Sequence, residues 1–279
     1  MSEGPDSRRT GSDRPIGFFD SGVGGLTVLH ECLVSLPAED YLYVGDSGHF
    51  PYGEKSTDEL LERAQVIAGY LLDQDVKLLV VACNSATSAA GDSVRELGRE
   101  AGVPVVTVVG PEAEIAGAIT ENGRIGVLAT PATVSSGAYH RALEEQGRAF
   151  TVTEVAAPDL APIIQGGATF SEEVVETVRG YCRPLKEARI DTLILGCTHY
   201  PLIAPLLQRI LGRDVRLVTA GHAIAGAIQR RLASEGALRD GDGEGGYGFR
   251  VTGEKESFVT LGTRFLQLPL GDRVEHLEI

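Results

Sequence analysis

Short apolar segments alternate with helical patterns along almost the whole chain, and no other feature of the sequence limits the fold as strongly. Apolar runs of this length, bounded by polar and turn-forming residues, indicate buried strands. They are Ile16–Phe19, Tyr41–Val44, Leu78–Ala82, Val105–Val108, Ile125–Ala129, Val152–Ala156, Thr192–Leu195 and Val215–Val218. Strands that are separated by helices pair in parallel, with helices covering both faces of the sheet. The sequence therefore predicts an α/β fold built on mostly parallel, doubly wound sheets.

The segments between the strands carry helical periodicity. In Thr57–Asp73, leucine, isoleucine and alanine side chains recur on one face, as they do in a helix that packs on a core. Further helices are predicted at Asn84–Ala101, Thr133–Gly147, Ser171–Glu187 and Ala223–Ser234. The glycine-rich, polar stretch Gly236–Gly248 predicts a surface loop.

The chain repeats its own pattern. The segment RPIGFFDS (residues 14–21) resembles GRIGVLAT (residues 123–130), and in each half a later strand ends in a cysteine, Cys83 or Cys197. The repeat predicts two similar, pseudo-symmetric domains, residues 15–107 plus 217–279 and residues 108–216, after a flexible tail over residues 1–14. The binding crevice of such folds lies at the carboxyl ends of the strands. We therefore expect the domains to face each other across a cleft that contains both cysteines.

Composition excludes several function classes. The 279 residues carry a net charge of −14, so nucleic acid is not an expected partner, because phosphate binding needs clustered lysine and arginine. Since no apolar run is long enough to span a membrane and the polar N-terminus does not resemble a signal peptide, we expect a cytoplasmic protein. An ordinary solvated surface explains the acidity, and adaptation to high salt is the alternative. The four cysteines form no C-x-x-C pair, so they predict free thiols rather than a metal site.

Three segments carry candidate chemistry. Cys83 follows a strand and precedes a predicted helix, whose unpaired N–H groups lower the pKa of a thiol and can hold a carboxylate; a buried structural cysteine is the alternative. Cys197 also ends a strand, and His199 lies two residues later, where an imidazole can support a thiolate. Asp20 ends the first strand, before a glycine-rich turn, where it could relay a proton or cap the next helix.

With these residues in place, the sequence resembles the glutamate racemases of the aspartate/glutamate racemase superfamily. The resemblance rests on FDSGVGGLT (19–27), PYG (51–53), ACNSAT (82–87) and GCTHYP (196–201), and it extends from about Ile16 to about Leu266. It implies a cofactor-independent amino-acid racemase with its active site between two domains. The substrate would be glutamate, converted from the L to the D form for peptidoglycan in cell wall synthesis. Relatives of this kind are often homodimers.

The resemblance also assigns roles to individual residues. Cys83 and Cys197 would be the two acid/base groups, with Asp20 assisting the first and His199 the second. The groups around the α-amino and α-carboxylate of the substrate would be Ser21, Asn84, Ser85 and Thr198. The groups around its side-chain carboxylate would be Tyr52, Gly53, Thr130 and Thr133.

Three positions depart from the family pattern. Ser85 replaces a threonine and keeps the hydroxyl, while Ala157 replaces a cysteine. Gln165 replaces the carboxylate that is expected to assist His199. This last change puts the second proton relay in question, because an amide cannot take up a proton.

The chemistry of racemisation agrees with the resemblance. An α-proton leaves from one face and returns on the other, so two opposed acid/base groups are the simplest arrangement. Without a pyridoxal cofactor, oriented N–H donors must stabilise the developing charge. Three alternatives stay open: a racemase for another amino acid such as aspartate, a hydrolase that uses Cys197 and His199, and a binding or regulatory protein.

Overall fold

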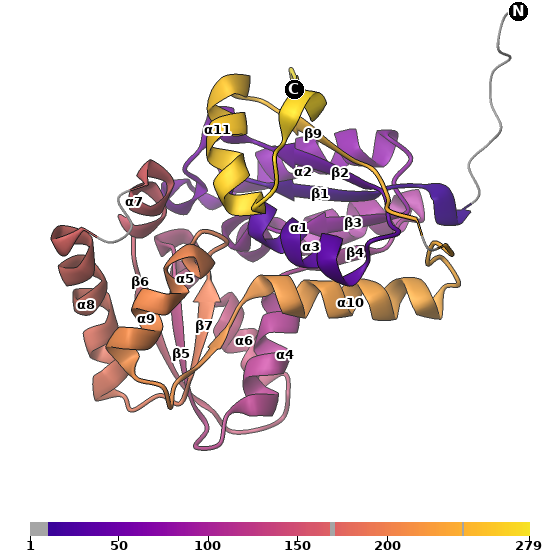
Figure 1. Cartoon of the computed structure of the whole chain (residues 1–279). Coiled ribbons are helices and arrows are strands. Elements are labelled where there is room, and N and C mark those ends of the chain that lie inside the picture. Colours follow the sequence, from indigo (N-terminus) through magenta and orange to yellow (C-terminus); the bar gives the residue numbers. More distant parts are fainter. Residues whose placement is uncertain (1–10, 168–170, 242) are drawn as a thin grey trace, which may run out of the picture.

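Two parallel sheets organise the protein. The structure is a computed structural model that describes residues 11–167, 171–241 and 243–279. Its six-stranded sheet has the order β10-β9-β2-β1-β3-β4, and its four-stranded sheet has the order β6-β5-β7-β8. The two sheets occupy separate halves of the molecule (Figure 1). The pairings within both sheets are parallel, which confirms the predicted fold class.

The two sheets share one strand order. The larger sheet contains β1 (Ile16–Asp20), β2 (Tyr41–Gly45), β3 (Leu78–Val81), β4 (Val105–Thr107), β9 (Tyr247–Val251) and β10 (Val274–His276). The smaller contains β5 (Arg124–Ala129), β6 (Thr151–Ala156), β7 (Thr192–Gly196) and β8 (Arg216–Val218). The run β2-β1-β3-β4 matches β6-β5-β7-β8, so β1 lies beside β3 as β5 lies beside β7. The repeat in the sequence is thus a repeat of topology.

Helices cover both faces of the larger sheet. On one face α2 (Thr57–Asp73) and α3 (Asn84–Ala101) pack together over Phe19 and its neighbours. On the other face α1 (Leu26–Ser35), α10 (Ala220–Ser234) and α11 (Lys255–Leu266) lie over Phe18 and its neighbours. Consecutive residues of β1 therefore enter different apolar clusters, as expected of a strand that is buried on both faces.

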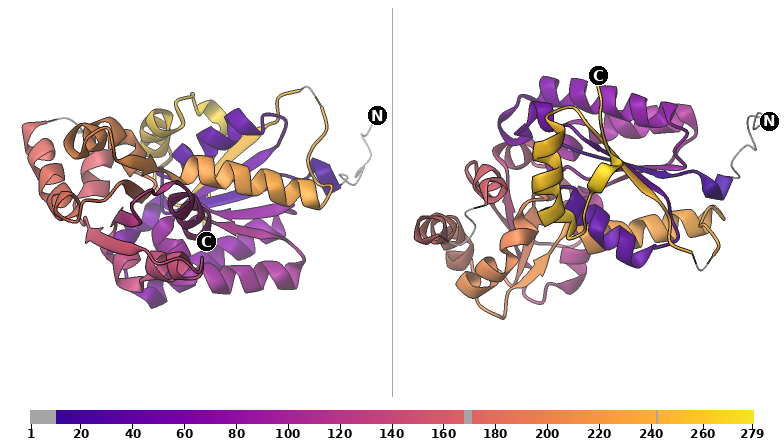
Figure 2. Two further views of the ribbon diagram at one scale, coloured as in Figure 1. Left: turned by 90° about the horizontal axis from the view of Figure 1, so that it is seen from below. Right: turned by 45° about the horizontal axis from the view of Figure 1, so that its top comes forward.

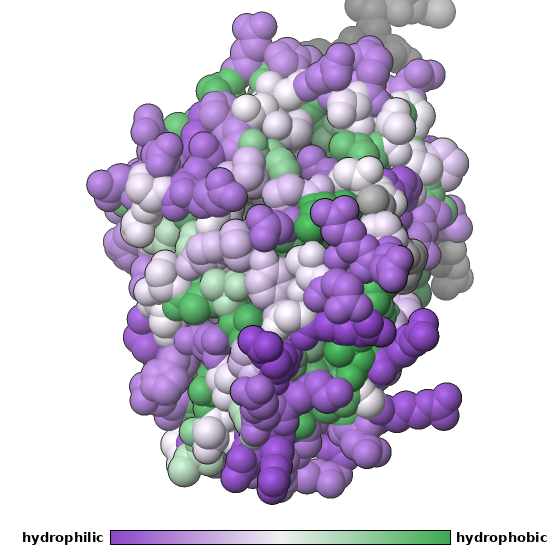
Figure 3. Space-filling model, turned by 90° about the vertical axis from the view of Figure 1, so that its left-hand side faces the viewer, coloured by the Kyte–Doolittle hydropathy of each residue, from purple (hydrophilic) through white to green (hydrophobic). Residues whose placement is uncertain are grey.

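The smaller sheet is covered in the same way. Its helices are α4 (Val109–Ile119), α5 (Pro131–Ser136), α6 (Ala138–Glu144), α7 (Leu160–Gly166), α8 (Glu172–Glu187) and α9 (Ala204–Leu211). The pair α4 and α6 and the pair α8 and α9 lie on opposite sides of the sheet (Figures 1 and 2). Helix α10 also contacts α4, so it joins the two halves. Figure 3 shows that hydrophilic residues dominate the surface on the side of α7, α8 and α9.

The predicted elements are mostly present, with two corrections. The eight predicted strands and the helices Thr57–Asp73 and Asn84–Ala101 are found. The prediction of a single helix over Thr133–Gly147 was wrong, because Gly137 adopts a φ of 64° and divides this segment into α5 and α6. The loop predicted to reach Gly248 ends earlier, since Tyr247 begins β9 beside β2.

The N-terminal tail is only partly described. Residues 1–10 of the predicted tail lie outside the described residues. Gly11–Asp13 forms a 3-10 turn, η1, and the carbonyl of Ser12 accepts a hydrogen bond of 2.7 Å from Lys77 Nζ. This last part of the tail is therefore attached to the domain. Over the described ranges, no helix has the length and apolarity needed to cross a membrane.

Candidate active site

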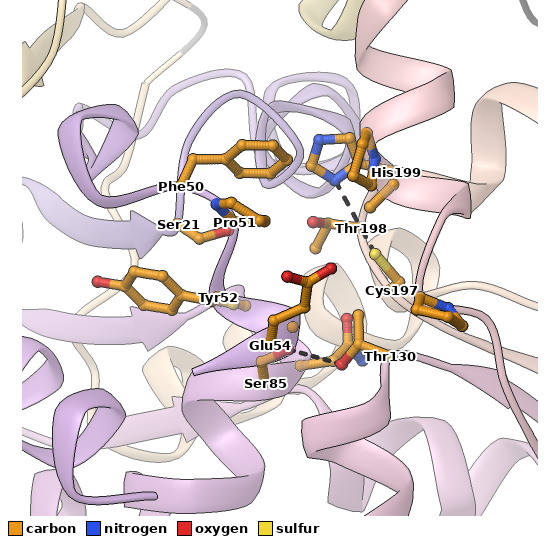
Figure 4. A pocket seen from close by; sticks show the side chains of 16 residues that line it. Ser21, Phe50, Pro51, Tyr52, Glu54, Ser85, Thr130, Cys197, Thr198 and His199 are labelled. Atoms are coloured by element: carbon orange, nitrogen blue, oxygen red, sulfur yellow. Dashed lines mark hydrogen bonds between the residues drawn. The ribbon is translucent and has the colours of Figure 1, made fainter. Parts of the chain in front are cut away.

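A pocket lies where the carboxyl ends of the two sheets face each other. It has a volume of about 430 Å³, counting its open mouth. Residues that directly follow β1, β3, β5 and β7 line it. The predicted site residues among them are Ser21, Tyr52, Gly53, Cys83, Asn84, Ser85, Thr130, Cys197, Thr198 and His199. Residues from both halves of the repeat thus meet in one cavity (Figure 4).

Cys83 sits at the N-terminus of a long helix. It is the N-cap of α3, and its Sγ accepts a hydrogen bond of 3.5 Å from the backbone N–H of Ala86. This N–H is one of the donors that a helix start leaves without a backbone partner. The helix start therefore gives the Cys83 sulfur both a donor and a partial positive charge.

The pKa of Cys83 is nevertheless higher than expected. The side chain is only 5% exposed, and burial together with the charge of Asp20 raises its pKa to about 12. The hydrogen bond from Ala86 lowers the pKa, but by less. The expectation of a lowered pKa was wrong for this structure, because the cost of burying the thiolate exceeds the effect of the helix.

Asp20 supports the turn that comes after β1. Its carboxylate accepts hydrogen bonds from the N–H of Gly22 at 3.0 Å and from Thr198 Oγ1 at 3.1 Å. Because it is fully buried, its pKa is raised, although these hydrogen bonds oppose the change. A carboxyl group of this kind can take up a proton more readily than one in water.

Cys197 has a histidine beside it rather than a helix start. Its Sγ lies 3.9 Å from His199 Nδ1, and burial raises the thiol pKa. Burial also lowers the pKa of His199 to about 3, so the imidazole is neutral near pH 7. The aromatic rings of Phe50 and Phe265 lie 5.5 and 5.1 Å from it.

Gln165 occupies the position expected for a carboxylate. Its Oε1 lies 3.0 Å from His199 Nε2. Since the amide oxygen is an acceptor, Nε2 carries the proton, and Nδ1 offers a lone pair to the Cys197 thiol. The amide thus keeps the contact with His199 but supplies no negative charge to it.

The two halves approach closely behind the sulfurs. A Cβ placed on Gly24 would collide with Thr198 Oγ1 and would lie 2.5 Å from His199 Nδ1. The hydroxyl of Thr27 donates to the carbonyl of Thr198 at 3.0 Å. The glycine-rich turn after β1 is therefore shaped by contact with the segment that carries Cys197.

A group of hydroxyls lies at another part of the wall. Ser85 Oγ and Thr130 Oγ1 are 2.8 Å apart, and Thr130 Oγ1 donates to Thr133 Oγ1 at 3.1 Å. Thr133 is fully buried behind Thr130 and is not among the lining residues. A Cβ on Gly53 would lie 2.9 Å from Thr130, so only glycine allows this approach.

The Tyr52 side chain turns away from the pocket. Its hydroxyl donates to Asp46 Oδ2 at 2.5 Å, and Asp46 is also held by Arg63. Figure 4 shows its ring directed away from Cys197. Tyr52 can therefore offer a substrate its backbone rather than its hydroxyl.

Some lining residues were absent from the predicted set. They are Phe50, Pro51, Glu54, Pro158, Ala161 and Pro162. Pro51 is the first residue of the PYG motif, and Phe50 and Glu54 adjoin it, so the motif could have suggested all three. Pro158 and Pro162 come shortly after the Ala157 position. Among the described residues no cluster of three or more histidine, cysteine or acidic side chains could hold a metal ion.

Comparison with known proteins gives consistent matches. The sequence model described as Asp/Glu/Hydantoin racemase matches residues 27–228. A glutamate racemase of Mycobacterium tuberculosis is 43% identical over 258 residues, which cover 92% of this chain and 94% of the relative. A crystal structure of a glutamate racemase from Bacillus anthracis has a TM-score of 0.91 and 34% identity, covering 96% of this chain and 98% of that chain. One from Francisella tularensis, in complex with D-glutamate, has a TM-score of 0.87 and 32% identity, covering 96% and 97%.

Proposed function

The chain belongs to the aspartate/glutamate/hydantoin racemase family, and from this premise we propose that it interconverts L- and D-glutamate by proton transfer between Cys83 and Cys197. One observation carries the proposal. The two cysteines come after equivalent strands, β3 and β7, and line one pocket from opposite halves of the molecule. A substrate between them would present one face to each sulfur.

The reaction needs one thiolate and one thiol. The thiolate removes the α-proton from one face of the substrate, and the electron pair of the broken C–H bond passes to the α-carbon and its carboxylate. The opposite thiol then donates its proton to the other face of the α-carbon. In the reverse direction the two sulfurs exchange roles, so no other proton donor is required.

Substrate binding supplies the charge that turns a thiol into a thiolate. Burial raises the pKa of both cysteines, so both are protonated in the free enzyme. The α-ammonium group of an amino acid brings a positive charge next to them, which favours a thiolate. Asp20 can take the Cys83 proton, and His199 Nδ1 can take that of Cys197. The chemistry would thus begin only after glutamate has entered.

Polar groups of the wall match the charges of glutamate. Ser21, Asn84, Ser85 and Thr198 would surround the α-amino and α-carboxylate groups, with the N-terminus of α3 stabilising charge that develops on the carboxylate. Thr130 and the backbone at Tyr52 and Gly53 would hold the side-chain carboxylate, with Thr133 fixing Thr130 from behind. No step of this scheme needs a metal or an organic cofactor.

The decisive test is incubation with L-glutamate in D₂O. We expect the optical rotation to fall to zero while the α-proton signal disappears from the NMR spectrum. A parallel reaction with L-aspartate should be far slower. Loss of rotation only with aspartate would identify another racemase. Release of a cleaved product, or no reaction with either amino acid, would favour the hydrolase or binding alternatives.

The cellular setting forms part of the same proposal. The enzyme would act in the cytoplasm on free glutamate and supply D-glutamate for peptidoglycan. It would do so as a homodimer, which light scattering of the purified protein can test.

A further inference from the structure

A buried glutamate lies beside the pocket but has no role in the two-thiol scheme. Glu112 on α4 is fully buried. Its Oε2 accepts hydrogen bonds from Tyr139 OH at 2.5 Å and from Asn84 Nδ2 at 3.0 Å, and Asn84 Nδ2 also lies 2.7 Å from Tyr139 OH. Asn84 lines the pocket and comes from the other half of the molecule, on α3. The three side chains therefore connect the two halves at the edge of the site.

Two atoms of this cluster have no partner. Among the described residues, nothing donates to Asn84 Oδ1 or contacts Glu112 Oε1 by a hydrogen bond. A buried polar atom without a partner is costly, so such atoms are rare in folded proteins. Asn84 uses its nitrogen on Glu112 and Tyr139, which leaves its oxygen as the atom that remains for a substrate.

The direction of the hydrogen bonds depends on the charge of Glu112. An ionised carboxylate can only accept, so Tyr139 and Asn84 must both donate to it. A protonated Glu112 can instead donate to the Tyr139 oxygen, and Tyr139 can donate to an amide oxygen of a rotated Asn84. The 2.7 Å separation between Tyr139 and the Asn84 amide is usual for an O–H···O bond and short for an N–H···O bond. Both arrangements thus fit the same positions.

We propose that Glu112 is a positioning residue whose protonation, relayed through Tyr139, decides whether Asn84 presents its amide nitrogen or its oxygen to the substrate. This inference rests on the proposed racemisation of glutamate, with Asn84 beside the α-carboxylate. A neutral Glu112 turns the donor toward that carboxylate. An ionised Glu112 turns an acceptor toward it and adds a negative charge near an anionic substrate.

The surroundings of Glu112 allow this change near neutral pH. Burial raises its pKa to about 8, while the hydrogen bonds from Tyr139 and Asn84 oppose the rise. The titratable groups that interact with it are Tyr139 on α6 and Cys197 after β7, whose pKa an ionised Glu112 raises. In the described part of the chain, no charged group of α10 or β8 perturbs it, although both elements pack on α4.

The test compares Glu112→Gln with the wild-type enzyme between pH 6.5 and 9.5. Glutamine has the shape of the protonated glutamate and cannot ionise. For the wild type, we expect KM for L- and D-glutamate to rise about tenfold through pH 8, the effect of losing one hydrogen bond to a charged group. In Glu112→Gln this rise should be absent, and KM should stay at the low-pH value. Tyr139→Phe, which removes the relay, should raise KM at low pH and flatten the same transition.

Infrared difference spectra give a second readout that does not depend on turnover. A carboxylic acid C=O band should titrate near pH 8 in the wild type and be missing in Glu112→Gln. Superimposable KM–pH profiles of wild type and Glu112→Gln, or an unchanged infrared titration, would overturn the inference. If the wild type did not racemise glutamate at all, the proposed function would fail instead. A Glu112→Gln protein that cannot fold would also overturn the inference about Glu112, because a neutral side chain of the same shape should be tolerated.

Discussion

The two sides of the pocket begin with the same residue and support it differently. Cys83 caps a helix, receives the Ala86 N–H and has the carboxylate of Asp20 nearby. Cys197 precedes the short 3-10 turn η4 (Tyr200–Ile203) and has the neutral imidazole of His199 at 3.9 Å. One sulfur thus lies at the start of a helix, beside a carboxylate. The other is supported by the backbone N–H and the neutral imidazole of His199, which the Gln165 amide holds.

The repeat therefore preserves the positions of the two sulfurs but not the groups that surround them. The strand order places both sulfurs at equivalent ends of β3 and β7. The residues after each strand differ between the halves, and they determine which groups can move a proton. If the two sides are as unequal as their surroundings, matched substitutions should have unequal effects.

The largest effect should come from the sulfurs themselves. Cys83→Ser and Cys197→Ser should each lower kcat/KM for racemisation by about 10³-fold or more, because a serine hydroxyl is far less acidic and each group is an obligatory acid or base. Each variant should still exchange the α-proton of one enantiomer in D₂O, and the two variants should prefer opposite enantiomers. Cys182→Ala, which alters a buried thiol outside the pocket, is the control and should racemise normally. Substantial racemisation by either serine variant contradicts the two-thiol scheme.

The supporting groups should contribute unequally. Asp20→Asn keeps the shape but cannot take a proton, and it should lower kcat/KM by about 10²-fold. His199→Gln should lower it by about tenfold, because it removes a single long contact to the sulfur. Steady-state kinetics with both enantiomers measure this, with thermal unfolding as the check on folding. Equal losses in the two variants would mean that the sides are functionally alike.

Restoring a carboxylate should make the two sides more similar. In Gln165→Glu the new charge lies beside His199 and should raise its pKa. We expect kcat/KM to change by no more than about 10²-fold, and by the same factor for L- and D-glutamate, because the equilibrium constant between them is one. The pH profile of kcat/KM should shift as well. If rate and pH profile both stay unchanged, position 165 does not influence the Cys197 side.

The smallest effect concerns stability, and it should have opposite signs on the two sides. The pKa of His199 is about 3 in the folded protein and roughly 6.5 in the unfolded chain. The contribution of its neutral imidazole to the free energy of unfolding is therefore lost as the pH falls below 6.5. By pH 5 this loss should reach about 2 kcal/mol. Asp20 has a raised pKa, so its contribution is present at low pH and is lost as the pH rises. Urea unfolding of wild type, His199→Gln and Asp20→Asn at pH 5 and 7 should separate the two contributions to stability. If His199→Gln keeps the pH dependence of the wild type, that dependence does not come from His199.

The sequence predicted the strands and residues that form the site better than the pKa values within it. Strands such as Leu78–Val81 are buried on both faces, so continuous apolar runs identified them. Strand β9 was missed because glycine and arginine interrupt it, and only Phe249 and Val251 are buried. The pocket residues were predicted because they come directly after strands in short recognisable motifs.

Tertiary contacts account for the features that the sequence did not predict. The direction of the Tyr52 ring depends on Asp46, and the raised pKa of Cys83 depends on how completely its side chain is buried. No pattern in the sequence around Glu112 indicated that this residue is buried. Its burial and its partners come from α3 and α6, which are distant along the chain.

Because both sulfurs are enclosed, the enzyme can keep for a time the protonation state that its last substrate left. Cys83 and Cys197 are only 5% and 7% exposed. In the two-thiol scheme, each conversion moves a net proton from one sulfur to the other. The protein that has just released the product therefore differs in the position of one proton from the resting enzyme, in which both sulfurs are protonated. That form is ready for the product enantiomer and must be reset before it accepts the first one again. The direction of the preceding turnover is therefore stored, for a time, in the position of a single hydrogen.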